Sequence, residues 1–550
     1  MAQVFVNGKI YTQNDANDRV DTVVIDDGVF TYVGARDGYS PAPDDEVIDL
    51  QGKCVLPGLI DSHQHWLYPI VTSGPHANET PFLFSPSLED VLVQCKQFVE
   101  AHPEYQVYKV QAGNKDLWSR KPNKYDFDVF CPDKPFMMLD ASTHAWSGNS
   151  KLFEAIGVTK ETPDPSPGLS QYERDENGEL TGYATEYSAF DALRVVDTVP
   201  REDAVDNLRK LIEFNISMGI TGVYDAGTLE LKPDEETMDI LKELDEAGEL
   251  KQRVSISSVA HLPSRLPGLV ERQISHKKNY EGGNIVTDTV KIFIDGTPGE
   301  RTAYLLRPYK GTDIRGASMM TPDELYNTFV EANEAGFNVH LHICGDASLR
   351  MVLDAIERMD RAGIDRTVKF ILAHCQLIDP QDMPRLGELG VYVNLTPHWA
   401  GSLAAEPDPS FFMMHGYENE QYQTIWKTAP NVAWSCDAAA LPWIAGSLSS
   451  DGWNPFHGWQ IGATRLKVGD TDQSHVHMPE ECMTIDQMIQ GYTINGARQL
   501  GIDDMCGSIE TGKSADMVVL DANPYEIPIE EVHAILPEKV YFKGALAYER

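Results

Sequence analysis

The sequence predicts an α/β fold: a (β/α)8 TIM barrel, with a small β-sandwich built from both termini and an insertion after the first barrel strand. Three observations support this prediction. Short β-branched runs alternate with helical segments through residues 54–505, which is typical of a parallel sheet covered by helices. Both ends of the chain instead alternate polar and apolar residues. Histidine, lysine and aspartate residues also follow the predicted barrel strands at nearly regular intervals.

The strand-like ends predict the β-sandwich. Near the N-terminus the runs are QVFVNGKIYT, DTVVIDDGVFTYVG and EVIDLQGKCV, and Asp27-Gly28 between two strands is a strong hairpin signal. GSIETGKSADMVVLD and HAILPEKVYFKGALAYE have the same character near the C-terminus. We therefore expect residues 1–53 and 506–550 to meet in one sandwich outside the barrel.

Eight runs predict the barrel strands. They are GLIDSHQH, GITGVYDAG, QRVSISSVA, TVKIFIDG, FNVHLHICGD, VKFILAHC, VYVNLTP and NVAWSCD. The clearest helix between them is TPDELYNTFVEANEAG, where Thr321 and Glu324 form a capping box and Gly336 follows the end. Eight such units predict a barrel over residues 54–505.

Spacing between the strand ends locates the insertion. A barrel of this class has about 30 residues per βα unit, and His342 and His374 are 32 residues apart. His65 and Lys291 are 226 residues apart, where three units require about 90. The excess predicts an insertion at about 67–200, close to the mouth of the barrel.

Residue types that bind metals end five of the predicted strands. His63 and His65 are two positions apart, so their side chains point to the same side of the first strand. The later members of the set are Lys291, His340, His342, His374 and Asp437. A single strand histidine is more often a packed core residue than a ligand. Here, however, all of these residues lie at the ends of predicted strands, in order along the chain, on the barrel face that carries active sites. Together they predict a metal site.

Composition restricts the partners. The chain has 84 acidic and 45 basic residues, a net charge of −39, which disfavours nucleic acids and anionic membranes. We find no signal-peptide h-region and no run of about 20 apolar residues. Eight cysteines without zinc-finger spacing favour a reducing compartment. We expect a cytoplasmic protein with a small-molecule substrate and no nucleic-acid or membrane partner; a homodimer stays open.

These residues resemble the amidohydrolase superfamily. The resemblance rests on the HxH of PGLIDSHQH, the strand-four lysine, the two later histidines and the strand-eight aspartate. The segments HAWSGNSKLFEAIGVTKETPDPSPG, VKIFIDGTPGERTA and HICGDAS are similar to the branch that includes N-substituted formamide deformylase. The resemblance covers nearly the whole chain. It implies a metal-dependent hydrolase that acts on carbon–nitrogen bonds other than peptide bonds.

The resemblance also implies a binuclear metal centre. Its ligands are His63, His65, Lys291, His342, His374 and Asp437. The HxH pair binds one ion, the two later histidines bind the other, and carbamylated Lys291 bridges them. Asp437 is the general base, so Asp437 and Lys291 are the catalytic residues. His340 has no place in this pattern and is expected just behind the ligands.

Elementary chemistry agrees with such a centre. Zn²⁺ lowers the pKa of bound water from about 15.7 to about 7. Zn²⁺ is therefore the expected cofactor, as one or two divalent ions, with Mn²⁺ or Fe²⁺ as alternatives. A free lysine, with a pKa of about 10.4, is cationic and cannot bridge two cations, whereas a carbamate can. Cys344, Cys375 and Cys436 lie beside ligands; a thiolate variant stays open, although strand alternation favours packing roles.

Further residues near the mouth are expected to contact the substrate. They are His144, Trp66, Trp118, Arg301, Asp295, His340 and His398. Tryptophans at a barrel mouth suit an apolar or aromatic substrate, and equally suit packing of the insertion onto the barrel. His144 is expected to orient the substrate carbonyl, and Arg301 and Asp295 to contact a polar group.

The favoured function is hydrolysis of an amide-type C–N bond in an N-formyl or N-acyl amine. One alternative keeps the centre and changes the bond, giving a deaminase, lactonase or decarboxylase. A second alternative is a non-catalytic relative that uses the barrel as a scaffold. The intact ligand set argues against the scaffold, while fold and family leave the substrate undetermined.

Overall fold

Eight parallel strands form the central sheet of the protein. The computed structural model describes residues 2–72, 80–113, 118–140, 143–197, 199–227, 233–401, 420–438 and 452–550. Its central sheet runs in sequence order through β8 (Leu59–Gln64), β15 (Ile220–Asp225), β16 (Arg253–Ala260), β17 (Ile285–Phe293), β18 (Asn338–Ile343), β19 (Phe370–His374), β20 (Tyr392–Leu395) and β21 (Asn431–Trp434). All eight predicted barrel runs are confirmed as strands.

Backbone hydrogen bonds join the first and last strands. The Asp437 N–H donates to the His63 carbonyl at 3.0 Å, and the His65 N–H donates to the Ala438 carbonyl at 3.0 Å. The Ser62 hydroxyl adds a bond to the Trp434 carbonyl at 2.9 Å. The seam therefore brings the HxH segment and the strand-eight aspartate side by side.

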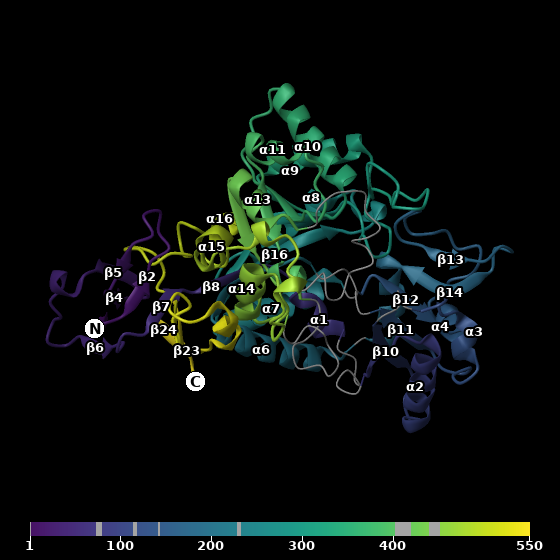
Figure 1. The fold of residues 1–550 in the computed structure, drawn as a ribbon, viewed down its shortest axis with the longest axis horizontal. Coiled ribbons are helices and arrows are strands. Elements are labelled where there is room, and N and C mark those ends of the chain that lie inside the picture. Colours follow the sequence, from purple (N-terminus) through teal and green to yellow (C-terminus); the bar gives the residue numbers. More distant parts are fainter. Residues whose placement is uncertain are drawn as a thin grey trace.

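Helices that lie between the strands or follow the last of them surround the sheet (Figure 1). They include α6 (Arg201–Ser217), α7 (Asp234–Glu246), α8 (Leu269–Tyr280), α9 (Pro322–Ala335), α10 (Asp346–Arg361), α11 (Met383–Glu388), α13 (Tyr422–Thr428), α14 (Pro455–Thr464), α15 (Ile485–Gly491) and α16 (Ile494–Leu500). The capping box predicted at Thr321 and Glu324 opens α9, and Gly336 ends it in a left-handed conformation, as predicted.

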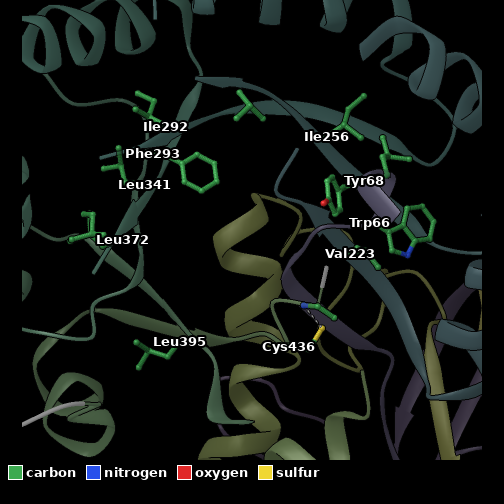
Figure 2. Packing of buried hydrophobic residues seen from close by; sticks show 14 of the residues in the cluster. Trp66, Tyr68, Val223, Ile256, Ile292, Phe293, Leu341, Leu372, Leu395 and Cys436 are labelled. Atoms are coloured by element: carbon green, nitrogen blue, oxygen red, sulfur yellow. Dashed lines mark hydrogen bonds between the residues drawn. The ribbon is translucent and has the colours of Figure 1, made fainter. Parts of the chain in front are cut away.

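One apolar side chain from each of six consecutive strands joins the main core (Figure 2). They are Val223, Ile256, Ile292, Leu341, Leu372 and Leu395. All six are buried. These residues alternate along the strands with polar residues such as Lys291 and His342. The polar side chains therefore lie on the opposite face of the strands.

The segment between β8 and α6 carries a second sheet. Its order is β13-β14-β12-β11-β10-β9, with β9 (Phe82–Phe84), β10 (Tyr108–Gly113), β11 (Phe136–Asp140), β12 (Ala145–Gly148), β13 (Tyr172–Arg174) and β14 (Leu180–Thr185). The described residues of this segment also form α1 (Leu67–Thr72), α2 (Leu88–Ala101), α3 (Lys124–Asp128), α4 (Ser150–Ala155) and α5 (Ala189–Val196). Figure 1 shows this sheet on the opposite side of the barrel from the two chain ends.

The two ends of the chain share a sheet. Its order is β24-β23-β22-β7-β2-β3, with β2 (Lys9–Tyr11), β3 (Arg19–Val20), β7 (Cys54–Pro57), β22 (Met517–Leu520), β23 (Pro537–Phe542) and β24 (Ala545–Glu549). A further sheet, β5-β4-β1-β6, contains β1 (Gln3–Val6), β4 (Thr22–Asp26), β5 (Val29–Gly34) and β6 (Glu46–Asp49). The predicted hairpin at Asp27-Gly28 joins β4 and β5, with both residues at positive φ.

Side chains of these two terminal sheets pack against one another. Phe5 on β1 meets Tyr541 on β23 edge to face, with ring centroids 5.1 Å apart, and both belong to one buried apolar cluster. The separate domain with bounds 1–53 and 506–550 stays a prediction. In the described part of the chain, no helix combines the length and apolar character needed to cross a membrane.

Candidate metal centre

Strand register places three of the predicted site residues on one face. Lys291 on β17 lies opposite His340 on β18, and Phe293 lies opposite His342. Residues two apart share a side of a strand, so Lys291, His340 and His342 all point to the barrel interior. All three are buried.

His374 reaches the same interior by a different route. The register pairs His342 with Ala373 on β19, so simple alternation would turn His374 away from the site. His374 instead has φ of 74° and Cys375 has φ of 44°, a left-handed conformation that non-glycine residues seldom adopt. The imidazole consequently lies 4.6 Å from the His342 ring and 5.0 Å from the His63 ring, between centroids.

Asp437 follows β21 and faces three histidines. Its Oδ1 is 3.4 Å from His63 Nε2 and 3.6 Å from His65 Nε2, and its Oδ2 is 3.8 Å from His374 Nδ1. Its backbone is also left-handed, with φ of 50°. Two separate departures from strand geometry thus aim ligand-type side chains at one point.

Lys291 lies within this group. Its Nζ is 3.4 Å from His63 Nε2. Burial lowers the pKa of Lys291 to about 7, although Asp437 opposes the shift. Burial likewise raises the pKa of Asp437 to about 7, with Lys291 opposing. Desolvation disfavours the charged form of each group, so both can exchange a proton near neutral pH.

The histidines are held in their neutral form. Burial lowers the pKa of His63, His342 and His374 well below the usual value. It lowers the pKa of His65 to about 3, with Lys291 adding to the effect. A neutral imidazole is the form that binds metals. The neutral rings therefore fit a divalent cation.

Two triads of described residues come close enough to hold an ion: His63, His65 and Asp437, and Asp295, His342 and Cys344, with donor atoms within 4.8 Å in each. The fit is supported by His374 Nδ1, which is buried and has no hydrogen-bond partner among the described residues. A buried unpaired nitrogen costs free energy, and a divalent ion would satisfy it.

Asp295 and Cys344 are less suited to ligation than their triad suggests. Both oxygens of Asp295 accept hydrogen bonds from the protein: from the backbone N–H groups of Tyr304, Cys344 and Gly345 and from the Ser348 hydroxyl, at 2.8–3.0 Å. Cys344 Sγ lies 3.5 Å from His342 Nε2. Burial raises the pKa of the Cys344 thiol well above its usual value, which favours packing over thiolate ligation.

His340 stands behind His63. Its Nε2 is 2.9 Å from His63 Nδ1, and its ring stacks on Tyr224 at 4.6 Å between centroids. His63 therefore has its Nδ1 directed at His340 and its Nε2 at Lys291 and Asp437.

The predicted substrate contacts lie in several places. His144 Nδ1 is 2.7 Å from Glu186 Oε2. Trp66 is buried in the main core, and the Trp118 indole N–H donates to the Ser85 carbonyl at 2.9 Å within the insertion. His398 Nε2 is 3.0 Å from the Asn454 carbonyl. Arg301 lies in the loop after β17, at φ of 60°.

Trp399, one of the tryptophans predicted near the barrel mouth, stacks on His374, with centroids 5.2 Å apart. Two further residues of the site, Asp61 and Glu186, were not predicted from the sequence. Asp61 accepts hydrogen bonds from the Gln64 amide at 2.9 Å and from the Cys436 N–H at 3.2 Å, which secures the turn before Asp437. Glu186 could not be found from sequence because its partner is 42 residues away.

Comparison with known proteins identifies the family. The model of the amidohydrolase family matches residues 46–548. The chain belongs to the amidohydrolase family. Over its full length it is 26% identical to the N-substituted formamide deformylase of Arthrobacter pascens, covering 98% of that protein. It is 24% identical to the putative amidohydrolase YtcJ of Bacillus subtilis, with both chains covered completely.

Solved structures agree on the fold of this amidohydrolase. A metal-dependent hydrolase from Pyrococcus furiosus superposes with a TM-score of 0.67 at 22% identity, over 96% of this chain and all of that one. A metal-dependent hydrolase from Pyrococcus horikoshii gives 0.68 at 20% identity, over 96% and 99%. The predicted family is confirmed by the family model, and these two structures share the fold of the chain.

Proposed function

We propose that the protein is a metal-dependent amidohydrolase that cleaves an amide-type C–N bond in an N-formyl or N-acyl amine. The observation that carries the proposal is the convergence of Asp437 on His63, His65 and His374 at 3.4–3.8 Å. The similarity to N-substituted formamide deformylase supports the choice of bond.

The four histidines His63, His65, His342 and His374 would hold one or two divalent ions, with Zn²⁺ the first choice. Such an ion supplies a water of lowered pKa and polarises the substrate carbonyl. Asp437 is the base: its carboxylate accepts a proton from the attacking water and passes it to the leaving nitrogen. Burial raises the pKa of Asp437 above the usual value of a carboxyl group, which makes its carboxylate a stronger base.

Lys291 would bridge two ions as a carbamate. The reaction adds CO₂ to a neutral amine and releases a proton, so it needs a lysine that is not fully protonated. Burial lowers the pKa of Lys291 to about 7, which provides the neutral amine. The Nζ is also buried and lies 3.4 Å from His63 Nε2, which supports a ligand role for Lys291.

The test uses protein loaded with Zn²⁺ or Mn²⁺ and a panel of N-benzylformamide, N-benzylacetamide and matched esters. We expect amide hydrolysis, and in Asp437→Asn a kcat lower by at least about 100-fold with the histidines still binding metal. Asp288→Asn changes a half-buried carboxylate on β17 that pairs with Lys277; it is the matched control and should keep full activity. Near wild-type turnover by Asp437→Asn would exclude it as the base, and inactivity of the loaded protein toward every amide would exclude the bond class.

A further inference from the structure

Glu186 is a buried carboxylate that the proposed mechanism has not used. It lies in the 3-10 turn Glu186–Ser188, directly after β14. Its side chain is 0% exposed, whereas the side chain of its partner His144 is 25% exposed. His144 Nδ1 is 2.7 Å from Glu186 Oε2, and the Glu186 N–H donates to the His144 carbonyl at 2.7 Å. Two contacts therefore fix this pair.

Strand pairing in the insertion brings the two residues together. His144 immediately precedes β12, and Glu186 immediately follows β14. These strands are antiparallel, with Ala145 opposite Thr185, so the next residues outward are His144 and Glu186. Glu186 then takes a left-handed φ of 53°. The strained conformation turns its carboxylate back toward the imidazole.

The other carboxylate oxygen holds a barrel loop. Glu186 Oε1 accepts hydrogen bonds from the Thr302 hydroxyl and from the Thr297 N–H, the latter at 3.4 Å. A Cβ at Gly296 would overlap Glu186 Oε1, so the loop that follows Lys291 fits closely against the carboxylate. Glu186 thereby fixes His144 relative to the metal centre.

The charge of Glu186 needs a compensating group. A carboxylate removed from water is costly unless it is paired. Its side-chain contacts come from a hydroxyl, a backbone amide and one imidazole. Of these, only the imidazole can carry a positive charge. As an imidazolium, His144 has two N–H donors, of which Nδ1–H faces Glu186 and Nε2–H is the second.

His144 also acts electrostatically on the metal centre. Burial raises the pKa of Asp437, and Lys291 and His144 both oppose that rise. Burial and Lys291 lower the pKa of His65 and of His342, and His144 adds to the lowering in each. These directions agree with the contacts of Glu186, which join His144 to the loop that follows Lys291.

We propose that Glu186 is a positioning residue that holds His144 as an imidazolium, whose Nε2–H donates a hydrogen bond to the carbonyl oxygen of the scissile amide. This inference rests on the proposed amide hydrolysis. His144 differs from the histidines that we propose as metal ligands in the closeness of its carboxylate. Its Nδ1 is 2.7 Å from the fully buried Glu186, whereas the three histidines that face Asp437 lie 3.4–3.8 Å from it. The hydrogen bond of His144 strengthens as negative charge develops on the carbonyl oxygen, which is the requirement for a catalytic donor.

The kinetic test is a double-mutant cycle. Glu186→Gln keeps the size and an oxygen for Nδ1–H but removes the charge; we expect kcat to fall by roughly 10²-fold with KM changed less than about threefold. His144→Ala and the double variant should lose the same amount as one another, because Glu186 acts only through His144. Glu173→Gln, the same change on β13 of the insertion sheet, should leave kcat unchanged. Losses that multiply in the double variant, or a wild-type kcat in Glu186→Gln, would overturn the proposal.

A second readout needs no substrate. In protein labelled with ¹⁵N-histidine, an imidazolium signal absent from His144→Ala identifies that ring. We expect Glu186→Gln to lose this signal and Glu173→Gln to keep it, with metal content equal in all variants. A wild-type spectrum without an imidazolium at His144 overturns the inference. The signal without any amide hydrolysis would reject the proposed function and the carbonyl role together, while leaving the charged pair established.

Discussion

His340 and His63 form a hydrogen bond in the candidate metal centre, and metal binding would decide which of the two rings donates the proton. His340 Nε2 lies 2.9 Å from His63 Nδ1. If His63 binds a metal through Nε2, its proton is on Nδ1 and donates to His340. A partner of this kind orients a ligand and raises its basicity.

Replacing His340 should therefore weaken metal binding. We expect His340→Ala to lower Zn²⁺ affinity by about 10–100-fold, the usual loss for such partners, measured by competition with a chromogenic chelator. Tyr224→Phe keeps the ring that stacks on His340 and serves as control, with affinity within about twofold. Unchanged affinity in His340→Ala, with the fold retained by circular dichroism, would show that His63 does not depend on this hydrogen bond.

Residue types and their order could be predicted from sequence, but two backbone conformations could not. Lys291 and His342 were predicted from position on their strands, since alternation sets where they point. His374 was expected to point inward merely because it ends a strand. It does so through a left-handed backbone at His374 and Cys375, which no local pattern signals. Glu186 was missed because its role depends on pairing between distant strands.

At the scale of elements, the turn after β18 is fastened to the loop after β17 by one carboxylate. Asp295 accepts four hydrogen bonds, from three backbone N–H groups and the Ser348 hydroxyl. Because Lys291 and His342 lie near the ends of these two strands, the hydrogen bonds of Asp295 join the segments that directly follow them.

Removing this carboxylate should destabilise the protein markedly. Asp295→Ala leaves four donors without their acceptor, three of them in buried residues, and each unpaired buried group costs about 1–3 kcal/mol. We expect the free energy of unfolding of the metal-free protein to fall by about 3 kcal/mol or more, measured by urea titration. Asp288→Ala, on β17 and half-buried in an ion pair with Lys277, should cost less than about 1 kcal/mol. A loss at Asp295 no larger than this control would contradict the fastening role.

Elements with strong local signals were predicted well. The capping box at Thr321 and Glu324 depends only on residues within four positions of one another. The eight barrel strands contain buried apolar runs. The insertion at about 67–200 was predicted from spacing alone, and the sheet between β8 and α6 was not anticipated. Its strands are short, such as Phe82–Phe84 and Tyr172–Arg174, and pair partly through distant segments. Short runs of this kind carry too few residues for a periodic pattern.

At the scale of the whole molecule, charge is the feature that stands apart. The chain carries 84 acidic and 45 basic residues, a net charge of −39. Many exposed basic residues already have acidic partners, as in the Lys9–Glu526 and Arg209–Glu249 pairs. The excess acidic residues therefore repel one another across the surface, and this repulsion opposes the compact state.

Salt should consequently stabilise the protein. The Debye length falls from about 30 Å at 0.01 M to about 10 Å at 0.1 M ionic strength, so repulsion between separated carboxylates is screened while contacts closer than that persist. We expect the thermal midpoint of the metal-free protein to rise by roughly 5 °C between 10 and 500 mM KCl, by differential scanning calorimetry. NaCl at matched ionic strength should give the same rise, because screening does not depend on the cation.

The rise should shrink near pH 5, where exposed carboxylates begin to take up protons and the net charge is smaller. A midpoint that stays flat or falls with KCl would mean that the exposed ion pairs, which salt weakens, outweigh the net repulsion.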